Sequence, residues 1–465
     1  MRIKTISPIL GIILLTVFSG CSSLQNYTLR TAPARAAVSA GDFNSALAVF
    51  PDDSAEGNNE LLIRLERGMI LQDLGLFEQS SSEFEKAVEK IKENEARAVI
   101  SASKTLSQAG SLIINEQIVQ YEGADFEVIL LHALNAMNYL LRGDLEGARV
   151  EVRRSHERQK LLFEKHEKEL QEARKDPLSD NWEQSFEQAD AQGYENLKEK
   201  ASSVYSVYQN AFASYISALV YELGGEPDDA YIDLKNAIQA YPSNPSIQKD
   251  LIRLSKMLGF KDEHDVWERT FGTALSVPKD SIDIFVVFSY GLSPYKMPIK
   301  LPIPISHGLT FASFPVYQFS PSAITGGKVD ANGLNENTST VYDVDAVAAK
   351  NLLDVFPIIF VKQAARSYLK AGATRSLEKN HGSSGAIIGT LFSAITEQAD
   401  LRAWSMLPKQ IHVARLFVPK AVEDITISST PAGGSSIVQV PKGASHMVVY
   451  LRATENGLAT YTKSF

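Results

Sequence analysis

The feature that most constrains this chain is a pair of helical segments, joined by a short turn, that recurs along its first half. In the clearest early copy, residues 60–90, apolar residues follow the 3.6-residue period of an α-helix on both sides of a turn near Gly75. Gly68 and Ser80 are small enough for two helices to approach closely, and Phe84 is placed to fill the groove between them. We therefore expect the first half to fold as a stack of antiparallel helix pairs.

The same frame fits two later segments and, with shortened helices, one earlier segment. It is marked by small residues, aromatics and a closing proline: Ala136, Tyr139, Gly143, Ala148 and Val152 in one copy, Ala218, Tyr221, Gly225, Ala230, Leu234, Ala237 and Pro242 in the next, and Ala36, Ala37, Gly41, Asp42, Ala46 and Phe50 in the early one. This pattern resembles the tetratricopeptide repeat (TPR). An ordinary helical bundle with Gly and Ala at its crossings is the alternative.

A solenoid of TPR-like helix pairs typically receives a peptide or a partner helix on its concave face. On that face we expect Asn135, Asn138 and Tyr139 to bind a partner protein. Residues 151–176 contain 15 charged residues among 26, with opposite charges often four apart. This spacing predicts a long solvated helix or a coiled-coil arm, on which His156 and His166 are expected to be solvated.

The helical periodicity ends at a domain boundary between Gly272 and Pro278. Alternating apolar residues at 282–288, prolines at 294–304 and several short runs after 410 predict strands, whereas residues 343–370 and 386–404 predict helices. The chain is thus expected to be an α+β protein, in which an all-α TPR-like helical-repeat domain, residues 31–275, precedes a smaller α+β domain with an antiparallel sheet, residues 276–465.

The amino terminus has the pattern of a secretory signal. Arg2 and Lys4 precede an apolar run of about ten residues, which is too short to span a bilayer, and small residues lead into Cys21, the one cysteine of the chain. The stretch 18–21 resembles a lipobox, which predicts a signal peptide over 1–20, acylation of Cys21 with palmitate-type chains, and a tether over 21–30. Ser22, where an Asp would retain the protein at the inner membrane, favours the periplasm-facing inner leaflet of the outer membrane.

Composition and motifs disfavour several function classes. A net charge of −9 argues against nucleic acid as a partner, and a single cysteine excludes an intramolecular disulfide framework and a zinc site of several thiolates. The run His381–Gly385 contains a serine between glycines, but the segment predicted before it is a helix where a nucleophile elbow needs a strand. We predict no catalytic residues, no metal ligands and no cofactor.

Residues 396–408 form the most distinctive motif, with Asp400, Arg402 and Trp404 at the expected end of a helix. Being two apart on a helix, Asp400 and Arg402 would point to different faces and need separate partners. These three residues are either a recognition surface for a partner or a helix cap and hinge, and Arg402→Ala would separate the two interpretations. Asp400, Arg402 and Trp404 are therefore candidate partner-binding residues.

The order of parts resembles a family of uncharacterised bacterial TPR-containing outer-membrane lipoproteins, often encoded near lipoproteins that activate penicillin-binding proteins. The resemblance is carried by the lipobox, the helical repeats, Asp343–Ala348, Glu397–Asp400 with Arg402 and Trp404, Leu407-Pro408 and Ala414-Arg415. It implies periplasmic or envelope protein partners and work in peptidoglycan or envelope assembly.

Together these features predict a membrane-anchored protein-interaction scaffold. Two alternatives remain: an envelope enzyme whose site uses residues such as His381, Ser384 or Asp400, and a subunit of a secretion or motility assembly that uses the charged helix as its contact arm.

Overall fold

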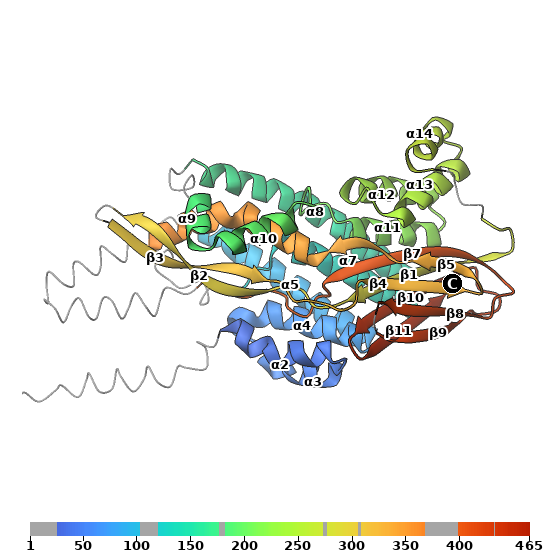
Figure 1. The fold of residues 1–465 in the computed structure, drawn as a ribbon, viewed down its shortest axis with the longest axis horizontal. Coiled ribbons are helices and arrows are strands. Elements are labelled where there is room, and N and C mark those ends of the chain that lie inside the picture. The colour runs from blue at the N-terminus through green and yellow to red at the C-terminus, as the bar shows by residue number, and fades with distance from the viewer. Residues whose placement is uncertain are drawn as a thin grey trace, which may run out of the picture.

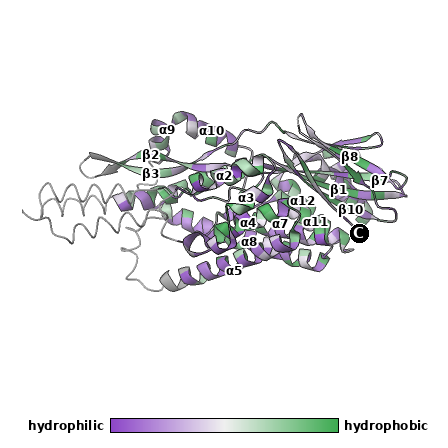
Figure 2. Ribbon diagram, turned by 90° about the horizontal axis from the view of Figure 1, so that it is seen from below, coloured by the Kyte–Doolittle hydropathy of each residue, from purple (hydrophilic) through white to green (hydrophobic). Residues whose placement is uncertain are grey.

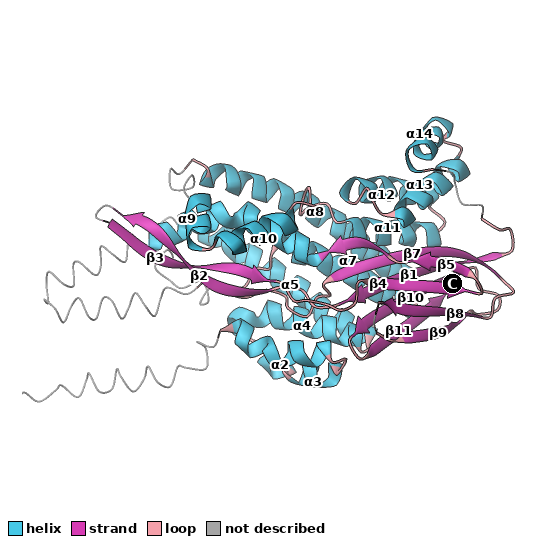
Figure 3. Cartoon of the chain, viewed as in Figure 1, coloured by secondary structure: helices cyan, strands magenta, loops and turns pink. Residues whose placement is uncertain are grey.

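A computed structural model of the protein describes residues 26–102, 120–175, 182–272, 277–305, 308–367, 399–431 and 433–465. Helices fill the first half of the chain and strands dominate the second (Figures 1 and 3). The helices are α2 (Tyr27–Ser39), α3 (Phe43–Ala48), α4 (Glu60–Asp73), α5 (Phe77–Ala102), α7 (Asp125–Arg142), α8 (Leu145–Ala173), α9 (Trp182–Ala189), α10 (Ala191–Ala201), α11 (Ala211–Leu223), α12 (Pro227–Ala240), α13 (Pro245–Leu258) and α14 (Lys261–Phe271).

Consecutive helices pack as antiparallel pairs, which confirms the helical-repeat prediction for the first half. The pairs α2–α3, α4–α5, α7–α8 and α11–α12 coincide with the four predicted copies, and α13–α14 adds a pair that the sequence did not reveal. Close approach explains the small residues, because a Cβ added to Gly68 would lie 2.3 Å from the ring of Phe84. At Gly147, the same addition would lie 2.3 Å from the ring of Tyr139.

The second half forms three sheets. The strands are β1 (Ser281–Tyr290), β2 (Tyr295–Ile305), β3 (Gly308–Gln318), β4 (Gly326–Ala331), β5 (Leu334–Asn337), β6 (Ser339–Asp343), β7 (Gln410–Pro419), β8 (Asp424–Thr430), β9 (Ser435–Gln439), β10 (His446–Thr454) and β11 (Gly457–Ser464). One sheet has the order β11-β10-β1-β7-β6, another β5-β4-β8-β9, and β2 pairs with β3 alone. The described pairs are antiparallel except β1–β10, which is parallel, so the predicted antiparallel sheet is in part a mixed one.

The five-stranded sheet is the middle layer of the molecule. Phe285 and Tyr450 on one face belong to the same apolar core as the helices, whereas their neighbours Ile284 and Val449 pack against the four-stranded sheet on the other face. Alternating side chains of one strand thereby serve two cores. This double burial explains why β1 is rich in apolar residues and is buried at nearly every position.

Buried ion pairs fasten the helices to this sheet. Near the end of α4, Asp73 accepts hydrogen bonds from Arg452 Nε and Tyr450 Oη, both at 3.1 Å. Farther along the array, Arg415 of β7 binds Asp250 of α13 at 2.9 Å and Asp283 of β1. Because a buried charge is tolerated only when it is paired, these contacts fix the two halves relative to each other.

A helix over residues 344–367 and the β2–β3 hairpin form the far end of the molecule from the sheet (Figure 1). They meet through stacked rings, with Phe314 centroids 5.6 Å from Phe356 and 5.5 Å from Phe360, and α9 adds Trp182 at 5.0 Å from Phe356. Figure 2 shows hydrophilic residues along α5, which lies at the lower edge of that view. No helix in the described ranges is long and apolar enough to cross a membrane.

Candidate functional site

Residues 399–408 run along the helical array, where side chains of α2, α4 and α7 bind their backbone. This segment is not helical in the structure, so the prediction of a helix through Trp404 is wrong for residues 399–404. It runs through the interior, where Trp404 is 1% exposed. An irregular backbone in such a place requires a partner for every N–H and C=O group.

Glu66 of α4 supplies much of what the buried backbone needs. Its Oε1 accepts hydrogen bonds from the backbone N–H of Ser405 at 2.8 Å, from the hydroxyl of Ser405 at 2.7 Å and from the hydroxyl of Tyr27 at 2.9 Å. Its Oε2 accepts the backbone N–H of Met406 at 2.8 Å. Burial raises the pKa of Glu66 to about 7, and these hydrogen bonds oppose that rise.

Glu127 of α7 binds the preceding residue of the segment. Its Oε1 accepts the backbone N–H of Trp404 at 2.8 Å, while Oε2 accepts the hydroxyl of Tyr121 and the backbone N–H of Ala124 at the start of α7. Two carboxylates on neighbouring inner helices thus hold three consecutive N–H groups.

Basic and hydroxyl side chains bind the carbonyls of the same segment. Lys296 donates to the carbonyl of Arg402 at 3.0 Å, Ser293 to that of Trp404 at 3.0 Å, and Arg35 of α2 to that of Ser405 at 2.9 Å. We call residues 399–408, together with Arg35, Glu66 and Glu127, the inner clasp.

Asp400, Arg402 and Trp404 lie together in the inner clasp and touch the protein itself. The guanidinium of Arg402 binds the carboxylate of Asp400 through Nε at 2.8 Å and Nη2 at 2.7 Å. The expectation that these two side chains face apart is wrong, because it assumed a helix. Trp404 packs edge-on to Phe84, with ring centroids 5.9 Å apart, whereas Asp400 and Arg402 also line a groove of about 530 Å³.

Asn135 and Asn138 lie inside the helical array, whereas Tyr139 is partly buried at its surface. Asn135 and Asn138 are fully buried, and Asn138 is hydrogen-bonded to Gln72 and Ser80 of the preceding helix pair. Tyr139 packs on Gly147 within its own pair. A partner cannot reach the two asparagines in this structure, so a partner-binding role for them would need the array to open.

Other predicted residues lie outside the described ranges: Cys21 with its lipobox, and His381 and Ser384. Sequence reasoning missed Glu66 and Glu127. Glu66 carried no clear signal, because Arg64 and Arg67 flank it in α4 and the three charged residues together resemble an exposed part of the helix.

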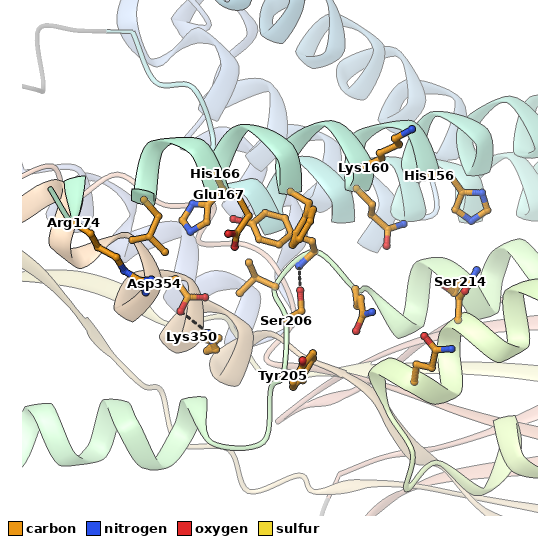
Figure 4. A pocket seen from close by; sticks show the side chains of 18 residues that line it. His156, Lys160, His166, Glu167, Arg174, Tyr205, Ser206, Ser214, Lys350 and Asp354 are labelled. Carbon is orange, nitrogen blue, oxygen red and sulfur yellow. Dashed lines mark hydrogen bonds and ion pairs between the residues drawn. The ribbon is translucent and has the colours of Figure 1, made fainter. Parts of the chain in front are cut away.

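A second feature is open to solvent: a groove of about 780 Å³ along the carboxyl-terminal half of α8 (Figure 4). We call it the α8 groove. It lies between α8, the loop over 202–210, the ends of α11 and α12, and the start of the helix over 344–367. Its described lining residues are His156, Gln159, Lys160, Phe163, His166, Glu167, Leu170, Arg174, Tyr205, Ser206, Val207, Tyr208, Gln209, Ser214, Asn236, Gln239, Lys350 and Asp354.

The prediction that both histidines of the charged helix are solvated is wrong for His166, whereas the side chain of His156 is 35% exposed. His166 is 5% exposed and stacks at a tilt against Tyr208, with centroids 5.5 Å apart. His156 pairs with Asp233 of α12 at 3.2 Å, and this hydrogen bond raises the pKa of His156. Ion pairs from Arg154 and Arg158 to α5 hold another face of α8, so it is packed into the array and is not a free arm.

The described residues contain no group of three or more His, Cys, Asp or Glu side chains placed to hold a metal ion. The side chains of the α8 groove offer hydrogen bonds and ring contacts, and those of the inner clasp bind the backbone of the chain itself.

No protein-family model and no curated protein matches this chain. Among solved structures it is similar to MamA, at 13% identity over 54% of this chain and 97% of MamA, with a TM-score of 0.28. It is also similar to the TPR2AB domain of yeast Sti1 in its pHSP90 complex, at 13% identity over 54% of this chain and 92% of that one, with a TM-score of 0.21. These TM-scores are too low to support an argument about the fold. The helix pairs of the chain itself are what define the helical region.

Proposed function

We propose that this protein is an outer-membrane lipoprotein, anchored through Cys21, that serves periplasmic proteins of envelope or peptidoglycan assembly as a scaffold. The helical array and the α+β domain act in this proposal as one body, and partners bind its outer surfaces. The lipobox pattern at Phe18–Cys21 supports the anchor, and the paired helices support the scaffold.

The observation that carries the proposal is the direction in which the inner helices point their polar side chains. Arg35 of α2, Glu66 of α4, Glu127 of α7 and Asp250 of α13 all bind residues of the second half. A solenoid whose concave face is filled by its own second domain is a rigid platform. Partner binding then belongs to its outer face.

Exposed apolar side chains on the outer helices fit this assignment. Ile232 on α12 is 53% exposed and Met257 on α13 is 57% exposed. Large apolar side chains in such positions are candidates for contact with other proteins.

Palmitate labelling combined with photo-crosslinking tests the proposal. We expect wild-type protein in growing cells to take up labelled palmitate and Cys21→Ser to take up none. A crosslinker at Met257 should capture an envelope protein, and one at the buried Asn138 should not. Label on Cys21→Ser would refute the anchor, and crosslinks from position 138 alone would return partner binding to the concave face.

A further inference from the structure

The α8 groove carries a set of side chains that the fold does not use. It runs beside α8 from His156 to Arg174, about 27 Å at 1.5 Å per residue. Its volume of about 780 Å³ is typical of sites for small organic ligands, which span about 300–1,000 Å³. The groove is therefore long and narrow enough for a chain-like ligand.

Aromatic rings stand exposed along this groove. Tyr205 is 87% exposed and Phe163 is 49% exposed, so neither ring is explained by core packing. Beneath them, the ring of Tyr208 lies 5.7 Å from that of Phe163, and its hydroxyl donates to Asp125 at 3.2 Å. Burial, with the adjacent carboxylate, raises the pKa of Tyr208, which keeps its hydroxyl protonated. The ring of Tyr208, which is held in place, thus supports the exposed ring of Phe163.

Primary amides face the same space. Gln209, Asn236 and Gln239 are exposed and make no side-chain hydrogen bond to any residue that the structure describes. Asn236 and Gln239 are three apart on α12 and so lie on one face of that helix. Each amide offers two donors and one acceptor to a ligand.

The charged and aliphatic residues of the groove disfavour two kinds of ligand, phosphates and extended apolar groups. Three basic residues, Lys160, Arg174 and Lys350, line the groove together with the acids Glu167 and Asp354. Lys350 is paired with Asp354, so the groove has no concentrated positive charge for a phosphate. Two of the described lining residues are aliphatic, Leu170 and Val207, too few to bind an acyl chain or the apolar face of a helix.

We propose that the α8 groove binds an oligosaccharide. Sugar rings present C–H faces that pack on aromatic rings such as Tyr205 and Phe163, and hydroxyl groups that exchange hydrogen bonds with the amides of Gln209, Asn236 and Gln239. The inference goes beyond the proposed scaffold function and does not depend on the lipid anchor, since the purified chain can be tested alone.

Calorimetric titration of the full-length chain with chitohexaose, cellohexaose and maltohexaose tests this site. We expect at least one hexasaccharide to bind with a Kd below about 1 mM. For that sugar, Tyr205→Ala and the double variant Asn236→Ala/Gln239→Ala should each weaken binding at least about tenfold, because they remove the ring face and the paired amides. Tyr205→Phe keeps the ring and should stay within about threefold of wild type.

Leu161→Ala is the matched control, because Leu161 is 48% exposed on the same helix but does not line the groove. Its affinity should equal that of wild type. The proposal is overturned if no hexasaccharide binds up to about 10 mM, or if binding survives Tyr205→Ala and the double amide variant unchanged. A failure of palmitate labelling would leave this result untouched.

Discussion

The inner clasp and the α8 groove contain similar kinds of side chain, but these are buried and bonded in the clasp and exposed in the groove. In the clasp, Glu66 and Glu127 bind backbone N–H groups of the same chain, and Trp404 is 1% exposed. In the groove, the amides of Asn236 and Gln239 on α12 make no side-chain hydrogen bond with the residues that the structure describes, and Tyr205 is 87% exposed. Polar groups and aromatic rings that contact the chain itself stabilise the fold. Those that remain exposed are available to a ligand. Mutations in the two regions should therefore differ in kind.

The largest expected effect is at Glu66. Replacing it with Ala leaves two buried backbone N–H groups, of Ser405 and Met406, without an acceptor, together with the hydroxyl of Tyr27. We expect Glu66→Ala to lower the free energy of unfolding by about 3–5 kcal/mol, measured by urea denaturation.

Glu89 on α5 provides the control, since its side chain is exposed. Glu89→Ala should change the free energy of unfolding by less than about 0.5 kcal/mol. Equal losses for the two variants would show that the inner clasp does not hold the domains together.

The stability that Glu66 gives to the inner clasp should also depend on pH. Burial raises the pKa of Glu66 from 4.5 to about 7, so the folded protein binds a proton there that the unfolded chain releases. The stability from this group is complete below pH about 4.5 and is lost as the pH rises through about 7, by up to about 3 kcal/mol.

A comparison of wild type with Glu66→Gln isolates this contribution. Asp73 and Asp345, whose pKa values burial raises to about 6, act in the same direction in both proteins and cancel. Between pH 4.5 and 8, urea denaturation should show a steeper fall in stability for wild type than for Glu66→Gln. Parallel curves would mean that Glu66 keeps an ordinary pKa.

A smaller loss is expected at Arg402. Arg402→Ala removes the two-pronged contact with Asp400 and uncovers the face of Tyr121, 5.3 Å from the guanidinium. We expect the free energy of unfolding to fall by about 1–3 kcal/mol, because the pair lies partly buried at the rim of the clasp. Arg174→Ala, at an exposed position on α8, should be neutral, and an equally stable Arg402→Ala would favour a recognition role for the motif.

The helix pairs could be predicted from the sequence because their determinants are local. Gly68, Ser80 and Phe84 meet within one pair, at separations of 16 residues or fewer. The strands after residue 410 were likewise visible as alternating runs. The parallel pairing of β1 with β10 was not, since it joins residues more than 150 positions apart.

The inner clasp could not be predicted for the same reason. Its central contact joins Glu66 to Ser405, 339 residues away, and no local pattern encodes that distance. Residues 399–404 carry helix-compatible side chains, yet the backbone N–H groups of Trp404 and Ser405 donate to the carboxylates of Glu127 and Glu66, which hold the segment in a non-helical path. The α8 groove was missed because the charged residues of α8 indicated a solvated helix, whereas part of that helix lines a cavity.

The smallest expected change in stability is at the exposed ring of the α8 groove. Tyr205→Ala should alter the free energy of unfolding by less than about 0.5 kcal/mol, since the ring contributes almost no buried area. Trp404→Ala, which empties a buried site against Phe84, should lower it by about 3–5 kcal/mol in the same urea experiment. If the tyrosine variant proved as unstable as the tryptophan variant, the ring would be a structural element and the distinction between a filled face and an open one would fail. A neutral result would be consistent with a role for Tyr205 in ligand binding, because its large aromatic ring lies exposed at the polar groove and takes no part in packing.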